Sequence, residues 1–375
     1  VLTAGLSGVM SGDGRNLTDA MLAAARPHLL RVLGPNCFGM LVPGIGLNAS
    51  FAHTDANVGD IAFVAQSGAL MAAMLDWAKT HGIGFSHFIS LGDAADVDCG
   101  DVLDYLASDP HTRAILLYLE SVTSARKFMS AARAAARNKP VIAIKAGRVA
   151  EASKAAASHT GALAGADDVY DAAIRRAGML RVATTLDLFD ALEMLKHAKP
   201  LRGNRLAIIT NGGGPGVMAT DALIASNGKL AQLSDATIAG LSAVLPTTWS
   251  HGNPVDIIGD APPERYVAAL KVLLDATEVD ALLFIHAPTA IVASTEIADA
   301  CAPVIRASPR NVLACWMGGD GVKAADAIFH SAGIPTYSTP EEAVRAFLQL
   351  TDYRRNQESL MQTPASVAEH FEPAT

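Results

Sequence analysis

The chain has 375 residues, half of them hydrophobic, and a formal net charge of -8. This length predicts two or three domains with sizeable cores. The acidic balance, without a basic stripe among aromatic residues, argues against a nucleic-acid partner. The uncharged run at 34–54 is broken by proline and glycine, so it does not predict a membrane span. Four scattered cysteines without a Cys-x-x-Cys pair indicate a reduced, cytoplasmic protein without a zinc site.

Short apolar strands alternate with helical periodicity in the first half of the chain. The sequence predicts strands at 61–66, 85–92, 114–120 and 140–147. Helices are predicted at 67–82, 101–109, 124–138 and from residue 166. This alternation is typical of a parallel sheet that is covered on both faces. Asp96 and Asp98 resemble a metal-binding pair, but we expect a turn and a helix start there, with the acids near the positive end of the helix dipole.

The pattern restarts after residues 199–204. Strands are predicted at 205–214, 280–288, 311–319 and 335–339, and helices at 215–228 and 264–277. Residues 1–58 contain one predicted strand, at 1–6, and one predicted helix. These are too few elements to form a separate domain. Residues 351–375 are charged and poor in apolar side chains, which predicts a linker or tail. Because the chain begins at Val1 and not at Met, we expect a fragment or a processed product.

Candidate functional residues follow the predicted strands, because ligands bind at the carboxyl ends of strands in open parallel sheets. Ser67, Gly68 and Ala69 open a helix whose free N–H groups attract an anion, although an ordinary helix cap also explains them. Glu120 ends an apolar strand, where it either orients a histidine or is a solvated loop residue.

Two further candidates are loops that are rich in small residues. The turn of Asn211, Gly212, Gly213 and Gly214 lets a ligand approach the backbone, or is only a tight turn; it matches neither the Walker nor the dinucleotide motif. His159 lies in "KAAASHTGALAG", and a neutral imidazole is a nucleophile that needs no metal. A lone histidine is more often structural, so His159 stands out only through its surroundings.

Those surroundings resemble a known family. The segments "RVLGPNCFGM", "VAQSGAL", "LGDAADVD", "LYLES", "KAGR", "SHTGALAG", "TNGGGPGVMATDAL" and "GNPVDIIGDAPPERY" occur in the order seen in NDP-forming acyl-CoA synthetases. These belong to the succinyl-CoA synthetase superfamily, and the chain is most similar to the ADP-forming acetate–CoA ligases. The resemblance implies an α/β fold of two consecutive flavodoxin-like parallel-sheet domains, at 59–200 and 201–350. They would follow the C-terminal half of a coenzyme-A-binding Rossmann domain at 1–58.

The resemblance also implies roles for individual residues. His159 would be phosphorylated, with Glu120 as its hydrogen-bond partner. Two helix starts would flank the phosphohistidine, and we expect them to converge near it. The two helix starts are Ser67, Gly68, Ala69 and Gly259, Asp260, Ala261. The resemblance also implies that a loop of Gly34, Pro35 and Asn36 binds coenzyme A. The glycine-rich turn of Asn211, Gly212, Gly213 and Gly214 is a further implied ligand-binding segment.

The implied reaction converts acyl-CoA, phosphate and ADP reversibly to acid, coenzyme A and ATP. It needs an ATP-grasp module that binds ATP or ADP with Mg²⁺, and this module is not in the sequence, so a partner domain or subunit and a homo- or hetero-oligomer are expected. An alternative is the acyl-CoA-binding regulatory region of a protein lysine acetyltransferase with a fused GNAT domain. The pairing of His159 with Glu120 favours the synthetase, because a region that only binds needs no phosphorylatable residue.

Overall fold

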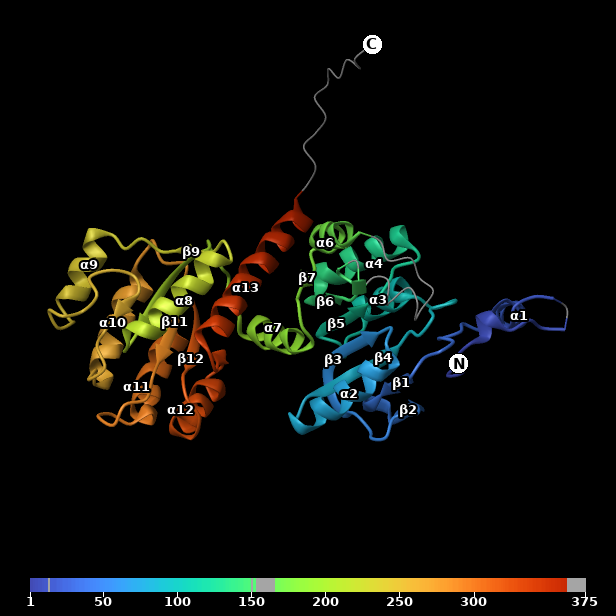
Figure 1. Ribbon diagram of the computed structural model, residues 1–375, viewed down its shortest axis with the longest axis horizontal. Helices are drawn as coiled ribbons and strands as arrows, with labels where there is room; N and C mark the ends of the chain where they lie inside the picture. The colour runs from blue at the N-terminus through green and yellow to red at the C-terminus, as the bar shows by residue number, and fades with distance from the viewer. Residues whose placement is uncertain (13, 150, 153–165, 363–375) are drawn as a thin grey trace, which may run out of the picture. The chain divides into compact units, whose positions relative to one another are not determined.

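The computed structural model describes residues 1–12, 14–149, 151–152 and 166–362. The chain divides into two compact units (Figure 1). Unit 1 comprises Val1–Leu188 and Arg355–Thr375, and unit 2 comprises Phe189–Arg354. Each unit has its own sheet and its own hydrophobic core.

Unit 1 holds a seven-stranded sheet in the order β2-β1-β4-β3-β5-β6-β7. Its strands are β1 (Gly39–Val42), β2 (Leu47–Ser50), β3 (Asn57–Ala65), β4 (Gly84–Ser90), β5 (Ala114–Leu119), β6 (Val141–Lys145) and β7 (Leu180–Arg181). Its helices are α1 (Leu17–Ala25), α2 (Gly68–Thr80), α3 (Cys99–Ser108), α4 (Ala125–Asn138) and α6 (Asp167–Arg176), and α7 (Thr185–His197) leads into unit 2. Short 3-10 helices lie at Leu6–Gly8, Arg26–His28 and Pro43–Ile45.

Strands β3 to β7 pair in parallel, as the sequence predicted. Alternate side chains of a strand point to opposite faces of the sheet. Ala62 and Val64 of β3 pack in one core cluster with residues of α3 and α4, and α2 contacts β3 and β4. The carboxyl ends of β3 to β6 therefore meet at one edge, where the predicted site residues of this unit follow.

The start of α3 confirms the prediction for Asp96 and Asp98. Asp98 is the N-cap, and its carboxylate accepts hydrogen bonds from the N–H groups of Gly100 and Asp101, at 2.8 and 3.1 Å. Asp101 closes a capping box by accepting from the Asp98 N–H. Asp96 accepts from the N–H of Val32 at 2.7 Å. Both carboxylates thus serve a turn and a helix start.

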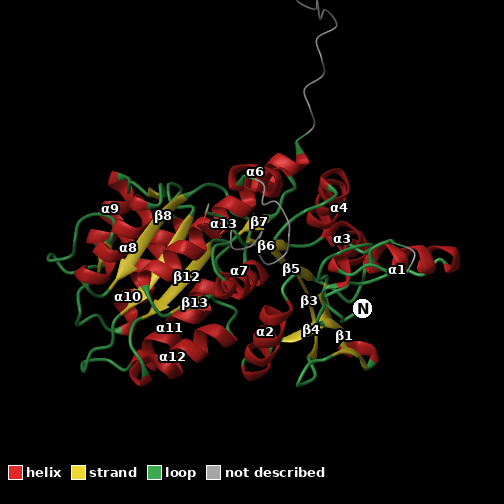
Figure 2. Cartoon of the chain, turned by 45° about the vertical axis from the view of Figure 1, so that its right-hand side comes forward, coloured by secondary structure: helices red, strands yellow, loops and turns green. Residues whose placement is uncertain are grey.

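Unit 2 holds a parallel six-stranded sheet, in the order β10-β8-β11-β12-β13 with β9 beside β8. Figure 2 shows β8, β12 and β13 of this sheet as yellow strands among red helices. Its strands are β8 (Arg205–Thr210), β9 (Lys229–Leu230), β10 (Val255–Asp256), β11 (Ala281–His286), β12 (Asn311–Trp316) and β13 (Thr336–Tyr337). Its helices are α8 (Gly213–Ala225), α9 (Asp235–Ser242), α10 (Pro263–Asp275), α11 (Ser294–Ala307), α12 (Asp320–Ser331) and α13 (Pro340–Met361).

Both faces of the second sheet are covered, which explains its almost wholly apolar strands. Ile209 and Phe284 pack in a core cluster with residues of α10, α11 and α12. On the opposite face, Ile208 and Leu283 pack in a cluster with residues of α8 and α13. The α/β fold with two parallel-sheet units is therefore confirmed.

Two predictions were wrong at the ends of the chain. Residues 1–6 form no strand, and the hairpin of β1 and β2 instead extends the first sheet, with β1 antiparallel to β4. Residues 351–361 are not a linker or tail, because α13 continues to Met361. Leu360 is buried in the core of unit 1, and the Asn356 amide donates to the Met179 carbonyl at 2.8 Å. These contacts stabilise a helix end whose sequence is mostly polar.

Among the described helices, none has the length and apolar composition needed to cross a membrane.

Candidate functional site

A cavity of about 580 Å³ opens at the carboxyl edge of the first sheet. Its lining comes from the loops after β3, β4 and β5 and from the loop that precedes β1. Five residues predicted for the site line it: Asn36, Ser67, Gly68, Ala69 and Glu120. The volume is in the range of small-molecule sites. The fold thus brings together three segments that lie far apart in the sequence.

The loop that carries Gly34, Pro35 and Asn36 is held against the loop after β4. The N–H of Asp93 donates to the Pro35 carbonyl at 2.9 Å, and the Asn36 amide donates to the Asp93 carboxylate at 3.0 Å. Gly92 adopts φ +55°, and a Cβ there would lie 2.2 Å from the Pro35 oxygen. Only glycine permits this approach. The loop predicted to bind coenzyme A is therefore positioned by these two hydrogen bonds, one from the backbone and one from a side chain, and by the close approach of Gly92.

Helix α2 points its N-terminus at the cavity. Ser67 is the N-cap, and its hydroxyl accepts from the Leu70 N–H at 3.4 Å, so the ordinary capping role is real. Gly68 and Ala69 follow in the first turn and line the cavity. The first N–H groups of a helix have no partner within it, and the helix dipole adds positive potential. This side of the cavity therefore suits an anion such as phosphate.

Gln66 positions Glu120. The side-chain carbonyl of Gln66, directly after β3, accepts from the backbone N–H groups of Glu120 at 2.6 Å and Ser121 at 3.0 Å. These two hydrogen bonds, which we call the clamp, hold the start of the loop after β5. Both Gln66 and Glu120 line the cavity. Sequence reasoning missed this role. The available signal was a polar residue between a buried strand and a helix cap.

Lys145 is a second residue whose role the sequence did not reveal. It ends β6 and is 1% exposed. Its ammonium lies 4.6 Å from the centre of the Tyr170 ring, and the Tyr170 hydroxyl accepts from the Val122 N–H at 3.1 Å. Burial is the main reason why the pKa of Lys145 lies below its ordinary value, and the carboxylates of Asp167 and Glu120 oppose that shift. Lys145 thus places a buried positive charge near the Glu120 carboxylate.

His159 and its loop lie outside the described residues, so its pairing with Glu120 stays a prediction. Four other histidines, His53, His87, His251 and His286, do not line this cavity. Within the described residues, no group of three or more histidine, cysteine or acidic side chains has an arrangement that would hold a metal ion.

In unit 2 the two other predicted segments are neighbours at the carboxyl edge of the sheet. Gly212 is the N-cap of α8 and has no side-chain cap, and a methyl group on Gly214 would meet no atom within 4 Å. A Cβ on Gly259 would lie 3.6 Å from the Asn211 carbonyl oxygen. The backbone at Gly214 is therefore open to a ligand. The Gly212 N–H instead donates to the Thr210 hydroxyl at 3.2 Å, and a Cβ on Gly213 would lie 3.3 Å from the Asp256 carboxylate.

Side chains in these segments have structural partners. The Asn211 amide group pairs with the backbone of Ala287, at 2.8 and 2.9 Å. Asp260 accepts from Arg265 at 2.5 Å, and Ala261 is buried ahead of α10. The expected convergence of the helix starts at Ser67 and Asp260 stays a prediction, because each belongs to a different unit.

Comparisons with known proteins agree with this arrangement. Residues 58–195 match the succinyl-CoA ligase like flavodoxin domain, and residues 206–360 match the Ligase-CoA domain. The chain is 42% identical to acetate–CoA ligase (ADP-forming) I of Archaeoglobus fulgidus, over 92% of this chain and 49% of that protein. It is 37% identical to the alpha subunit of acetate–CoA ligase (ADP-forming) I of Pyrococcus furiosus, over 92% of this chain and 74% of that subunit.

A solved structure extends the similarity to the fold. Dinucleotide-forming acetyl-coenzyme A synthetase 1 of Ca. Korarchaeum cryptofilum, in complex with phosphate and ADP, superposes with a TM-score of 0.85 at 34% identity. The match covers 98% of this chain and 79% of that one. The chain spans about half the length of the Archaeoglobus relative and about three quarters of the Pyrococcus alpha subunit. It belongs to the family of ADP-forming acetate–CoA ligases.

Proposed function

We propose that this chain is the acyl-CoA-converting part of an ADP-forming acyl-CoA synthetase of the acetate–CoA ligase type. The whole enzyme converts acyl-CoA, phosphate and ADP reversibly to acid, coenzyme A and ATP, through an acyl phosphate and a phosphohistidine at His159. The observation that carries the proposal is the cavity of unit 1, where Asn36, Ser67 and Glu120 meet.

The chemistry of this cavity suits the first half of the reaction. A phosphate oxygen attacks the thioester carbonyl, the thiolate of coenzyme A leaves, and an acyl phosphate forms. The first turn of α2 provides N–H donors for the phosphate, and the loop at Gly34, Pro35 and Asn36 holds the thioester end of coenzyme A. This acyl transfer requires that the attacking phosphate is positioned and its charge stabilised, which a helix N-terminus supplies.

The second half uses the histidine. A ring nitrogen of His159 attacks the phosphorus, and the acid leaves as its carboxylate. Glu120 accepts a hydrogen bond from the other ring nitrogen and stabilises the positive charge that the ring acquires. In unit 2, the open first turn of α8 at Gly214 offers a further place for a phosphate group.

The remaining chemistry belongs to a partner. An ATP-grasp domain or subunit binds ADP with Mg²⁺ and takes the phosphoryl group from His159, so the enzyme is a homo- or hetero-oligomer in the cytoplasm. In this assignment residues 1–58 are the second half of a coenzyme-A-binding Rossmann domain, and 59–200 and 201–350 are the two synthetase-like domains. The alternative of an acyl-CoA-binding acetyltransferase region is an outcome of the test below.

The test is phosphorylation of the chain in the presence of an ATP-grasp partner, radiolabelled ATP and Mg²⁺. We expect one acid-labile, base-stable phosphate per site. His159→Asn abolishes the label, because an amide does not form a phosphoramidate. Glu120→Gln leaves a weak label, since losing one oriented charge costs about 100-fold or more in rate.

The exposed residue His28 provides the matched control. His28→Asn removes another imidazole of unit 1 and keeps the full label. A wild-type chain that binds acyl-CoA but stays unlabelled with a competent partner would contradict the synthetase assignment and favour the acetyltransferase alternative.

A further inference from the structure

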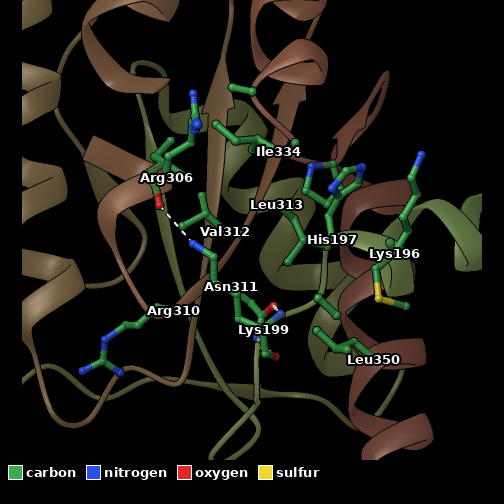
Figure 3. Close-up of a pocket in the computed structure, with 16 residues that line it drawn as sticks. Lys196, His197, Lys199, Arg306, Arg310, Asn311, Val312, Leu313, Ile334 and Leu350 are labelled. Carbon is green, nitrogen blue, oxygen red and sulfur yellow. Dashed lines mark hydrogen bonds between the residues drawn. The ribbon is translucent and has the colours of Figure 1, made fainter. Parts of the chain in front are cut away.

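A second cavity, of about 330 Å³, lies in unit 2, at the edge opposite the glycine-rich turn (Figure 3). It is lined by the amino ends of β12 and β13, where Asn311 and Pro335 lie, and by the last turns of α7 and α11. It therefore does not belong to the proposed phosphate site of this unit, which lies at the carboxyl ends of the strands.

Five basic residues and no acidic residue line this cavity in a chain whose net charge is -8, although the Arg310 guanidinium points away from the other four (Figure 3). Figure 3 shows them: Lys196 and His197 from the end of α7, Lys199 just after it, and Arg306 and Arg310 from α11 and the loop that follows. Within the described part of the chain, no ion pair joins Lys196, Lys199 or Arg306 to a carboxylate. A cleft lined by charges of one sign concentrates ions of the opposite sign.

Carbonyl groups at the C-termini of neighbouring helices balance part of this positive charge. The Lys199 ammonium donates to the carbonyls of Ile305 and Ser308 at the end of α11. Arg310 donates to carbonyls at the end of α10, among them that of Leu274. Each helix end carries only roughly half a negative charge. The Asp280 carboxylate also interacts with Arg310, and Glu193 accepts from His197 at 3.0 Å. Lys196, Lys199 and Arg306 therefore remain as the cations of this cavity that no carboxylate pairs among the described residues.

The position of Lys199 is built into the fold. The buried Asn311 amide accepts from the backbone N–H of Lys199 and donates to its carbonyl, both at 2.8 Å. Burial lowers the pKa of Lys199, and among the described residues no ion pair joins its ammonium to a carboxylate. A bound anion would supply that missing partner.

The rest of the wall is apolar. Met194, Leu313, Ile334 and Leu350 are each at most 5% exposed, and they face the same cavity as the basic groups. In Figure 3, Leu313 is drawn beside His197. A free inorganic ion would leave this apolar surface unused, whereas a ligand with a ring or a short hydrocarbon body would cover it.

We propose that this cavity is a binding site for an organic phosphate, a phosphate monoester attached to an apolar or aromatic body. The phosphate lies between Lys199 and Arg306, and the body packs on Leu313, Ile334 and Leu350. The site is separate from the acyl-CoA cavity of unit 1 and does not depend on the function proposed there.

The test is isothermal titration calorimetry of the full chain with phenyl phosphate at low ionic strength. This probe has one phosphate and one ring and contains neither adenine nor pantetheine. We expect phenyl phosphate to bind with a Kd below about 1 mM. Inorganic phosphate, which lacks the ring, and phenol, which lacks the phosphate, should each bind about tenfold more weakly or worse. Added salt weakens the binding of phenyl phosphate.

The deciding variants are Arg306→Gln and Lys199→Met, which we expect to weaken phenyl phosphate about tenfold or more. Lys323→Gln is the matched control, because Lys323 is an exposed cation of the same unit outside the cavity; it changes the Kd less than twofold. Arg306 is exposed, so its variant is informative even where Lys199→Met does not fold. Unchanged affinity in Arg306→Gln, an equal loss in Lys323→Gln, or equal affinity for inorganic phosphate would overturn the proposal.

Discussion

The hydrogen bonds of Gln66 predict that this side chain controls both the loop after β5 and the reactivity of the site. Gln66→Met preserves the length of the side chain but removes the oxygen that accepts from Glu120 and Ser121, at 2.6 and 3.0 Å. A neutral hydrogen bond contributes about 0.5–1.5 kcal/mol net, and a donor left unpaired in a partly buried place costs about 1–3 kcal/mol. The two losses together destabilise the local structure by about 2–4 kcal/mol.

Hydrogen exchange of the Glu120 and Ser121 amides measures this directly, because local opening exposes them to solvent. A loss of about 2 kcal/mol raises their exchange rate about 30-fold. The displaced Glu120 carboxylate also slows phosphorylation of His159 about 10- to 100-fold, since an error of about 1 Å in positioning has effects of that size.

Gln66→Glu separates geometry from charge. Its carboxylate still accepts both N–H groups, so amide protection stays close to that of the wild type. The added negative charge lies near Glu120, so the phosphorylation rate still changes. Wild-type exchange and wild-type labelling in Gln66→Met would refute the clamp, because both effects follow from the same two hydrogen bonds.

Three further predictions test the fold and the cavity. Leu360→Ala destabilises unit 1 by about 2–4 kcal/mol in urea unfolding followed by Trp77 fluorescence, because Leu360 fills the space beside Gly178; an unchanged midpoint would contradict the docking of α13. Gly92→Ala lowers acyl-CoA affinity about tenfold in calorimetry, since its Cβ would collide with the Pro35 oxygen, and unaltered binding would argue against that loop as the coenzyme A site. Burial alone would raise the pKa of Glu278, but its hydrogen bonds lower it from 4.5 to about 2, so its stabilisation is present above about pH 4.5 and is lost as the pH falls towards 2. Glu278→Gln removes that part of the acid dependence, and identical pH profiles of thermal unfolding would exclude this role.

The sequence by itself determined the local structure and which residues are candidates for the site. Strands such as β5 and β11 could be predicted because their apolar runs end at polar or glycine-rich turns. The start of α3 could be predicted because Asp98 caps it through bonds to residues within three positions. Such signals are local, so they are readable without knowing the fold. The ordered motifs pointed to Ser67 and Glu120 in the same way.

Only the tertiary structure decided which of these residues meet and what holds them. The bond from Gln66 to Glu120 spans 54 positions and exists because β3 pairs with β5. The burial of Lys145 and Leu360 depends equally on neighbours far along the chain. No local propensity encodes such contacts, because strand order and helix docking follow from the summed burial of many side chains. The same long-range packing made the polar end of α13 helical and left a basic cavity at the amino ends of β12 and β13.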